Sequence, residues 1–212
     1  MSASGGLKIA VFASGRGSNV RALADAIQAG IISNSTLSLV VSNNSICGAL
    51  EFARQRNIPA LHISRSQFRT DGEFTASLLI TLGNFGVNFI ALAGYMKKLP
   101  VELVKAFKNR IVNIHPALLP EFGGKGMYGM NVHNAVIERG VKVSGATVHL
   151  VDEEYDTGPI VLQERVEVLP SDTPESLAEK VLHVEHRLYP KAISLFAMGK
   201  VHVRGKEIII YE

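Results

Sequence analysis

The chain has 212 residues, 47% of them hydrophobic and 19% charged, which is enough to bury the core of one domain. Its basic residues form no run, so a nucleic-acid surface is not indicated. Its formal net charge of +3 is compatible with an anionic small-molecule substrate. The single cysteine, Cys47, excludes an intramolecular disulfide and fits a reducing compartment.

Strands and helices alternate in the first half of the chain. Short apolar runs rich in β-branched residues predict strands at 8–13, 37–42, 60–64, 88–94 and 110–115. The segments between them have helical length and periodicity, which predicts helices at 19–30, 47–57, 71–86 and 100–109. Near-continuous apolar strands that alternate with helices indicate a parallel sheet covered on both faces, so we expect an α/β, Rossmann-like doubly wound fold.

The second half of the chain has a different pattern, in which two strands flank a short turn and favour antiparallel pairing at the sheet edge. The predicted elements are a short helix near 131–139, antiparallel strands at 142–151 and 159–168, a long helix from about Thr173 to Met198, and a hairpin that turns at Arg204–Gly205. Pro190 lies inside the long helix, where we expect a kink. No linker or internal repeat interrupts the pattern, so residues 1–212 are expected to form one domain.

The amino-terminal "MSASGGLKIAVFAS" is too short and too polar for a signal peptide, and no apolar stretch is long enough to span a bilayer. These features predict a cytoplasmic protein, with monomer and homodimer both left open. No Cys/His array has zinc spacing. "HVEH" (183–186) lacks the HExxH order, so we interpret it as helix surface and expect no metal.

The loop "ASGRGSN" (13–19) joins the first strand to the first helix, where the free N–H groups of a helix start favour an anion. Gly15 and Gly17 allow the backbone to approach a ligand, and Ser18 and Asn19 are good N-cap residues. Val20 breaks the G-x-G-x-x-G dinucleotide pattern, so a monophosphate is the better functional interpretation. An ordinary tight turn explains this loop about as well.

The segment "RIVNIHPALLP" (110–120) places Asn113 and His115 two residues apart, so in a strand their side chains share a face. An amide and an imidazole together can bind a carbonyl oxygen and move a proton. The turn "DEEYDTGP" is expected at the same edge of the cleft, which brings Asp156 near His115 to hold the imidazole. The structural alternative is a well-capped turn made rigid by its prolines.

The loop after the fourth strand, "LAGYMKKLP" (92–100), offers apolar surface with two lysines beside it. Its residues are Tyr95, Met96, Lys97, Lys98 and Leu99. Core packing and solvated charge explain the same pattern without a ligand.

Five segments carry a resemblance over essentially the whole chain: "ASGRGSN", "LAGYMKKL", "IVNIHPALLP", "GATVHLVDEEYDTGPIVLQ" and "EHRLYP". In this order and spacing they resemble the phosphoribosylglycinamide formyltransferases, also called glycinamide ribonucleotide transformylases, of the folate-dependent formyltransferase family. The resemblance implies transfer of a formyl group from 10-formyltetrahydrofolate, a co-substrate, to the amine of glycinamide ribonucleotide in purine biosynthesis. It also implies a division of the domain, with about 7–110 binding the ribonucleotide phosphate and about 88–170 carrying the folate and catalytic part.

The resemblance assigns the chemistry to Asn113, His115 and Asp156. The amide and the imidazole would stabilise the oxyanion of a tetrahedral intermediate. Asp156 would raise the proton affinity of His115 and order a water that relays the proton. His149 is either a support for this group or a satisfied sheet histidine, and His133 is interpreted as structural or surface.

Substrate contacts are also implied by the resemblance. Those for the ribonucleotide are Gly17, Ser18, Asn19 and Glu185. Those for the folate are Arg69, Tyr95, Met96, Lys97, Leu99, Glu153, Glu154 and Tyr155, among which Arg69 rests on a loose match. Leu182 departs from the family pattern, because some relatives carry a lysine there. The Gly-rich insert 123–129 matches a variant of bacterial members and has no assigned role.

Alternatives remain at this point. Within the family, a hydrolase of formyltetrahydrofolate or another amine formyltransferase would share the motifs, although both the hydrolase and the transfer-RNA enzyme are expected to carry an extra domain. Outside it, a nucleotide-binding oxidoreductase shares the fold class but is opposed by the missing third glycine. A noncatalytic nucleotide-binding module would not need Asn113, His115 and Asp156 together.

Overall fold

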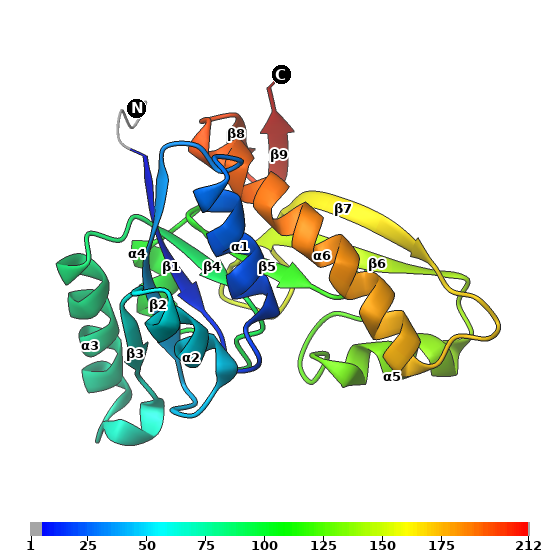
Figure 1. Ribbon diagram of the computed structural model, residues 1–212, viewed down its shortest axis with the longest axis horizontal. Coiled ribbons are helices and arrows are strands. Elements are labelled where there is room, and N and C mark those ends of the chain that lie inside the picture. Colours follow the sequence, from blue (N-terminus) through cyan, green and yellow to red (C-terminus); the bar gives the residue numbers. More distant parts are fainter. Residues whose placement is uncertain (1–5, 212) are drawn as a thin grey trace.

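The computed structural model describes residues 6–211, which are built around a seven-stranded sheet with the order β3-β2-β1-β4-β5-β6-β7 (Figure 1). The strands are β1 (Leu7–Phe12), β2 (Ser35–Ser42), β3 (Ala60–His62), β4 (Phe89–Leu92), β5 (Ile111–His115), β6 (Val143–Leu150) and β7 (Ile160–Glu167). Neighbouring strands from β3 through β2, β1 and β4 to β5 pair in parallel. Strand β6 pairs antiparallel with β5, and β7 pairs antiparallel with β6. The α/β fold class expected from the sequence is therefore confirmed.

Helices cover both faces of the sheet (Figure 1). They are α1 (Ser18–Gln28), α2 (Gly48–Gln55), η1 (Arg65–Gln67), α3 (Asp71–Asn84), α4 (Val101–Ala106), α5 (Met130–Arg139) and α6 (Pro174–Ala197). Alternate β1 side chains separate the two cores: Ile9 and Val11 pack with α1, α2, α5 and α6, and Ala10 and Phe12 pack with α3 and α4. This two-sided burial explains why β1 is apolar at nearly every position.

Strand order reverses between β1 and β4, because chain connections leave β1 toward β2 on one side and enter β4 on the other. In open α/β sheets, ligands bind beyond the carboxyl ends of the strands at such a point. Helix α6 crosses the face near it and is anchored by Tyr189, which is fully buried. The Tyr189 hydroxyl donates to the carbonyl of Leu92, the last residue of β4, at 2.8 Å and lies 3.2 Å from the carbonyl of Val112 in β5.

Three local features expected from the sequence can be compared with the structure. The carboxyl-terminal hairpin pairs β8 (Val201–Arg204) with β9 (Glu207–Ile210), so it turns at residues 205–206, one residue later than expected. Helix α6 runs through Pro190 without interruption, and the expected kink stays a prediction. Within residues 6–211, no helix is long and apolar enough to cross a membrane. Residues 1–5, part of the segment compared with a signal peptide, lie outside the described residues.

Candidate functional site

A cavity of about 570 Å³ lies at the carboxyl ends of β4 and β5. Its walls come from the loops after β1, β4 and β5, from the turn between β6 and β7, and from α5 and α6. The predicted site residues that line it are Asn19, Tyr95, Met96, Lys97, Leu99, Asn113, His115, Glu154, Tyr155, Asp156 and Glu185. A volume of this size, with mixed apolar and polar walls, is typical of a small-molecule site.

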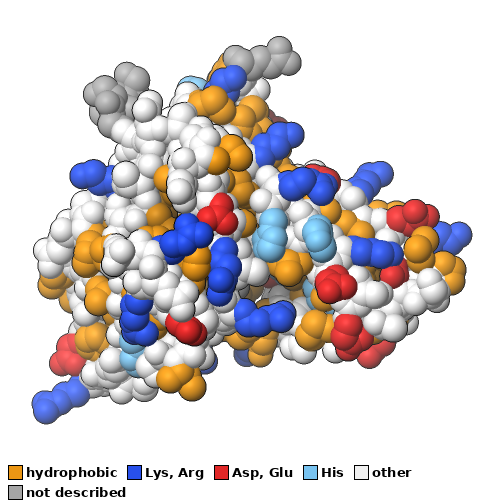
Figure 2. Space-filling view, viewed as in Figure 1, with side chains coloured by type: hydrophobic (Ala, Val, Ile, Leu, Met, Phe, Trp, Pro, Cys, Tyr) orange, Lys and Arg blue, Asp and Glu red, His pale blue; other side chains and the backbone are white. Residues whose placement is uncertain are grey.

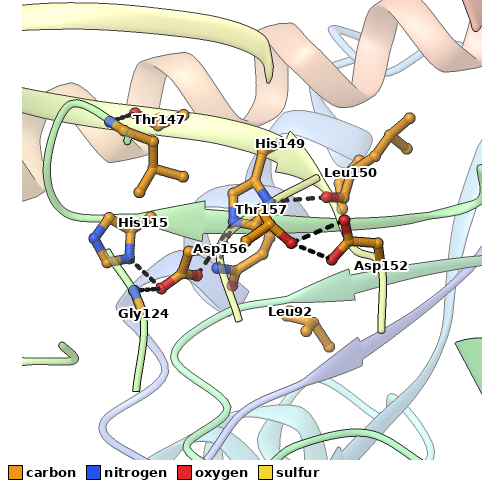
Figure 3. A network of polar contacts seen from close by, with 12 residues as sticks. Leu92, His115, Gly124, Thr147, His149, Leu150, Asp152, Asp156 and Thr157 are labelled. Carbon is orange, nitrogen blue, oxygen red and sulfur yellow. Dashed lines mark hydrogen bonds and ion pairs between the residues drawn. The ribbon is translucent and has the colours of Figure 1, made fainter. Parts of the chain in front are cut away.

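Asp156 faces two histidines inside this cavity (Figure 3). Its Oδ2 lies 3.7 Å from His115 Nδ1, and its Oδ1 lies 3.5 Å from His149 Nε2. The backbone N–H of Gly124 donates to Oδ2 at 2.9 Å. Asp156 has a positive φ of 57°, so the turn aims its carboxylate at the cavity through a left-handed backbone conformation. The approach of Asp156 to His115 is the one expected from the sequence.

Asn113 and His149 are partners across the β5–β6 ladder. Asn113 Nδ2 lies 3.1 Å from His149 Nε2, and His149 Nδ1 lies 2.9 Å from the carbonyl of Leu150. Because a carbonyl can only accept, His149 carries a proton on Nδ1, and its Nε2 lies between the Asn113 amide and the Asp156 carboxylate. Thus His149 contacts both Asn113 and Asp156, which favours the supporting role over that of a histidine satisfied elsewhere in the sheet.

His115 donates from Nε2 to the carbonyl of Phe122 at 2.8 Å, so its two ring nitrogens face Phe122 and Asp156. The sequence interpretation expected Asn113 and His115 to address one shared oxygen. In the structure each is directed at a protein group, and catalytic hydrogen bonds often realign when substrate binds. Phe122 immediately precedes the Gly-rich insert, so this hydrogen bond ties His115 to the start of that insert.

Burial and charge act in opposite directions on this group. Burial lowers the pKa of His115 and outweighs the Asp156 carboxylate, which raises it. Burial raises the pKa of Asp156, but the hydrogen bond from His149, the charge of His115 and the Gly124 N–H together hold that pKa below its usual value. Asp156 therefore raises the proton affinity of His115, as expected from the sequence. The pKa of His115 is nevertheless lowered overall, because burial has the larger effect.

The loop 13–19 differs from its expected capping. Gly17, with a φ of 79°, is the N-cap of α1 and provides no side-chain cap. Asn19 instead donates from Nδ2 to Glu185 Oε2 on α6 at 2.7 Å, so the N-cap role expected for Ser18 and Asn19 is wrong. Burial raises the pKa of Glu185 to about 7, although the Asn19 bond opposes this. The pair joins α1 to α6 at the cavity wall.

On the opposite wall, the loop after β4 is tied to the loop after β1. The backbone N–H of Met96 donates to Ser14 Oγ at 2.9 Å, and Lys98 pairs with Glu154 at 3.3 Å. Burial raises the pKa of Tyr95 to about 12. This wall combines an exposed Met96 with the buried Leu99, so it offers the apolar surface expected from the sequence.

Four predicted contacts do not line the cavity: Gly17, Ser18, Arg69 and Glu153. Gly17 and Ser18 flank lining residues in the first loop, so backbone contact with a ligand at the cavity edge is compatible with their position. Arg69 is exposed before α3, and its backbone N–H donates to Glu73 Oε2 at 2.9 Å. Glu153 is exposed and pairs with Lys105 at 3.8 Å.

Several lining residues were not predicted as ligand contacts. Gly124 to Met130, which comprise most of the Gly-rich insert and the start of α5, form one wall together with His133. His133 is 5% exposed, so of its two interpretations, structural or surface, the surface one is excluded. Arg16 also lines the cavity from the first loop, where its position between Gly15 and Gly17 was the available sequence signal.

Among residues 6–211, no group of three or more His, Cys, Asp and Glu side chains could hold a metal ion. His183 of the "HVEH" segment is exposed on α6, and its Nδ1 donates to the Glu179 carbonyl at 2.8 Å. Figure 2 shows histidine side chains on the surface over α6, whereas Val184 and Glu185 of the same segment are buried, so only part of the segment is helix surface.

Comparisons with known proteins place these features in context. The family model described as formyl transferase matches residues 7–193. The chain is 48% identical over 198 residues to the chloroplastic phosphoribosylglycinamide formyltransferase of Arabidopsis thaliana, covering 93% of this chain and 68% of that protein. It is 47% identical over 194 residues to the protein of the same name from Vigna unguiculata, covering 92% of this chain and 62% of that protein. The crystal structure of glycinamide ribonucleotide transformylase 1 from Symbiobacterium toebii is similar, with a TM-score of 0.91, 39% identity and coverage of 97% and 94% of the two chains.

Proposed function

The chain belongs to the formyl transferase family, and on this premise we propose that it transfers a formyl group from 10-formyltetrahydrofolate to the amine of glycinamide ribonucleotide. The names of the plant and bacterial relatives support this substrate pair. The observation that carries the proposal is the placement of Asp156 against His115 and His149, with Asn113 beside them, on the wall of one cavity.

The reaction forms a bond between the ribonucleotide amine and the formyl carbon, and it breaks the bond from that carbon to N10 of the folate. The tetrahedral intermediate carries an oxyanion. Asn113 donates an N–H to this oxygen and His115 assists once its Nε2 leaves the Phe122 carbonyl. The amine loses a proton and N10 gains one, and Asp156 supports this transfer by ordering a water and holding His115.

The two substrates approach from different walls. The ribonucleotide lies along the loop 13–19, where Gly17 and Ser18 offer backbone N–H groups to the phosphate and Asn19 and Glu185 face the remainder. The folate lies against the loop after β4 and the β6–β7 turn, with contacts from Tyr95, Met96, Lys97, Leu99, Glu154 and Tyr155. Arg69 and Glu153, which the family resemblance also assigns to the folate, do not line this wall.

A direct assay tests the proposal. The purified protein is incubated with 10-formyltetrahydrofolate, with and without glycinamide ribonucleotide, and both products are measured. We expect tetrahydrofolate release to depend on the ribonucleotide and to match the formylated product in amount. Tetrahydrofolate release without ribonucleotide identifies a hydrolase, and transfer to a different amine identifies another formyltransferase.

The same assay tests the catalytic group. Asn113→Ala is expected to lower turnover about 100- to 1000-fold with little change in substrate affinity, because the charge it meets exists mainly in the transition state. His115→Ala is expected to be similarly impaired, and the double variant should lose less than the product of the two factors. Normal turnover in folded Asn113→Ala and His115→Ala proteins, checked by circular dichroism, contradicts this assignment.

The location and assembly of the protein complete the proposal. We propose a cytoplasmic location, and the single buried cysteine, Cys47, fits any reducing compartment. Small-molecule substrates require neither nucleic acid nor a membrane, and both monomer and homodimer are compatible with a site built from one chain.

A further inference from the structure

Arg16 is a cation whose backbone is fixed at the edge of the cavity. The N–H of Ala49 on α2 donates to the carbonyl of Gly15 at 3.2 Å. Gly48 packs so closely that a Cβ there would lie 2.8 Å from the Arg16 carbonyl oxygen. The loop 13–19 is therefore held against α2, while the side chain of Arg16 is exposed and lines the cavity.

The guanidinium of Arg16 has no ion-pair or hydrogen-bond partner within residues 6–211. By contrast, Arg21 in the first turn of α1 stacks over the Phe52 ring at 4.9 Å, and Arg56 pairs with Asp25 at 3.2 Å. A loop fixed in place that carries an uncompensated cation at a cavity edge is suited to bind an anionic ligand.

The surroundings of Arg16 indicate the chemical class of that ligand. The N-cap Gly17 leaves the first N–H groups of α1 without a side-chain cap, and such groups favour a phosphate. Asn19 is 8% exposed and lines the cavity, and its Oδ1 is buried with no hydrogen-bond partner. A hydroxyl donor on a ligand, such as that of a sugar, would satisfy this acceptor. An anion and a hydroxyl together describe a sugar phosphate.

Charge is scarce at this end of the cavity. The lining residues contributed by the loop 13–19, α1 and α6 are Arg16, Asn19, Ala178, Leu182 and Glu185. Arg16 is the one cation among them, and Leu182 offers only apolar surface. Burial raises the pKa of Glu185 to about 7, so near neutral pH this carboxyl is in part uncharged and repels a phosphate less. Other lining cations, Lys97, Lys98 and Lys125, come from the opposite loop and the Gly-rich insert.

We propose that Arg16 binds the phosphate of the ribonucleotide substrate and makes the protein prefer the phosphorylated over the dephosphorylated compound. This inference rests on the proposed function for the identity of the substrate. The backbone N–H groups orient the phosphate, and Arg16 supplies the positive charge that those groups lack. Because Arg16 is exposed, salt screens its contribution, and its removal should weaken binding about tenfold at low ionic strength.

The test compares Arg16→Gln with Arg21→Gln, which removes the same charge from the same region but outside the residues that line the cavity. Calorimetry measures the Kd for glycinamide ribonucleotide, for its dephosphorylated riboside and for inorganic phosphate, at low and high salt. We expect Arg16→Gln to weaken ribonucleotide and phosphate binding about tenfold, to leave the riboside unchanged and to flatten the salt dependence. Arg16→Lys should recover part of the loss, and Arg21→Gln should behave as wild type.

Unchanged ribonucleotide and phosphate affinity in Arg16→Gln overturns the inference. Equal loss for ribonucleotide and riboside also overturns it, because that result points to a disturbed loop. The proposed function is judged separately by formyl transfer in the wild type: a wild type that binds phosphate through Arg16 but transfers no formyl group contradicts only the proposed function.

Discussion

Asp156 illustrates how a single turn residue sets the electrostatics of two others. It is part-buried, with a side chain 12% exposed, and it faces His115 and His149 at the same time. Its hydrogen bonds and its histidine neighbours hold the pKa of Asp156 low despite the effect of burial, so it is charged at neutral pH. That charge is what opposes the lowering of the His115 pKa by burial.

Asp156→Asn tests this residue-level balance. Asn tolerates a positive φ, so the turn should keep its shape. Loss of the carboxylate lowers the pKa of His115 further, so the acidic limb of the kcat/KM profile should move to lower pH, and turnover should fall. The measurement is a steady-state pH series on the variant and on Asp152→Asn, which removes a carboxylate that bonds Thr157 rather than His115. A limb that stays in place in Asp156→Asn, or moves equally in both variants, contradicts the assigned interaction.

At the scale of elements, the loop after β1 is determined by its packing against α2 as much as by any ligand. A Cβ on Gly17 would lie 2.6 Å from the Ala49 Cα, and the φ of Gly17 is 79°. Gly15, two residues earlier, has no atom within 4 Å of its potential Cβ. The two glycines therefore have different roles: Gly17 permits close contact between α1 and α2, and Gly15 faces open space.

Gly17→Ala should lower the free energy of unfolding by about 2 kcal/mol or more, because the left-handed conformation costs about 1–2 kcal/mol and the contact with Ala49 adds to it. It should also weaken ribonucleotide binding, since Gly17 is the N-cap of α1 in the loop proposed to hold the phosphate. Gly15→Ala is the matched control, with an expected change within about 0.5 kcal/mol. Urea unfolding of both variants measures the difference. Equal stability of the two would show that the loop absorbs the Gly17 side chain without strain.

For the molecule as a whole, buried histidines connect the site to stability. Burial, and secondly the charge of His115, lower the pKa of His133 from 6.5 to about 4. The unfolded chain takes up a proton near pH 6.5, whereas the folded chain does so only near pH 4. Stability from this residue is therefore complete above pH 6.5 and is lost as pH falls toward 4.

His133→Gln should reduce the difference in unfolding free energy between pH 7 and pH 5 by about 2 kcal/mol, since each pKa unit corresponds to about 1.4 kcal/mol. The comparison of two pH values separates this effect from any uniform loss caused by the substitution. His202→Gln, at an exposed position on β8, is the control and should keep the wild-type difference. Denaturant unfolding at both pH values provides the measurement. A wild-type pH dependence in His133→Gln would show that His133 titrates equally in both states.

The sequence by itself determined the order and type of the elements. Apolar periodicity is a local property, and β1 with its two-sided burial shows why it was readable. The motifs around Asn113, His115 and Asp156 also indicated the family, which the match over residues 7–193 confirms. Residues two apart on one strand share a face in any sheet, so the first pair could be grouped without knowledge of the fold.

Only the tertiary structure decided which groups meet. The pairing of Asn19 with Glu185 joins residues 166 positions apart, and no local pattern reports whether such a pair replaces an N-cap. The orientation of His115 toward the Phe122 carbonyl, the burial of His133, and the position of Arg69 outside the cavity are decided in the same way. Side-chain partners, burial and pKa depend on what the sheet and α6 bring together across the chain, whereas helix and strand formation depends mainly on near neighbours.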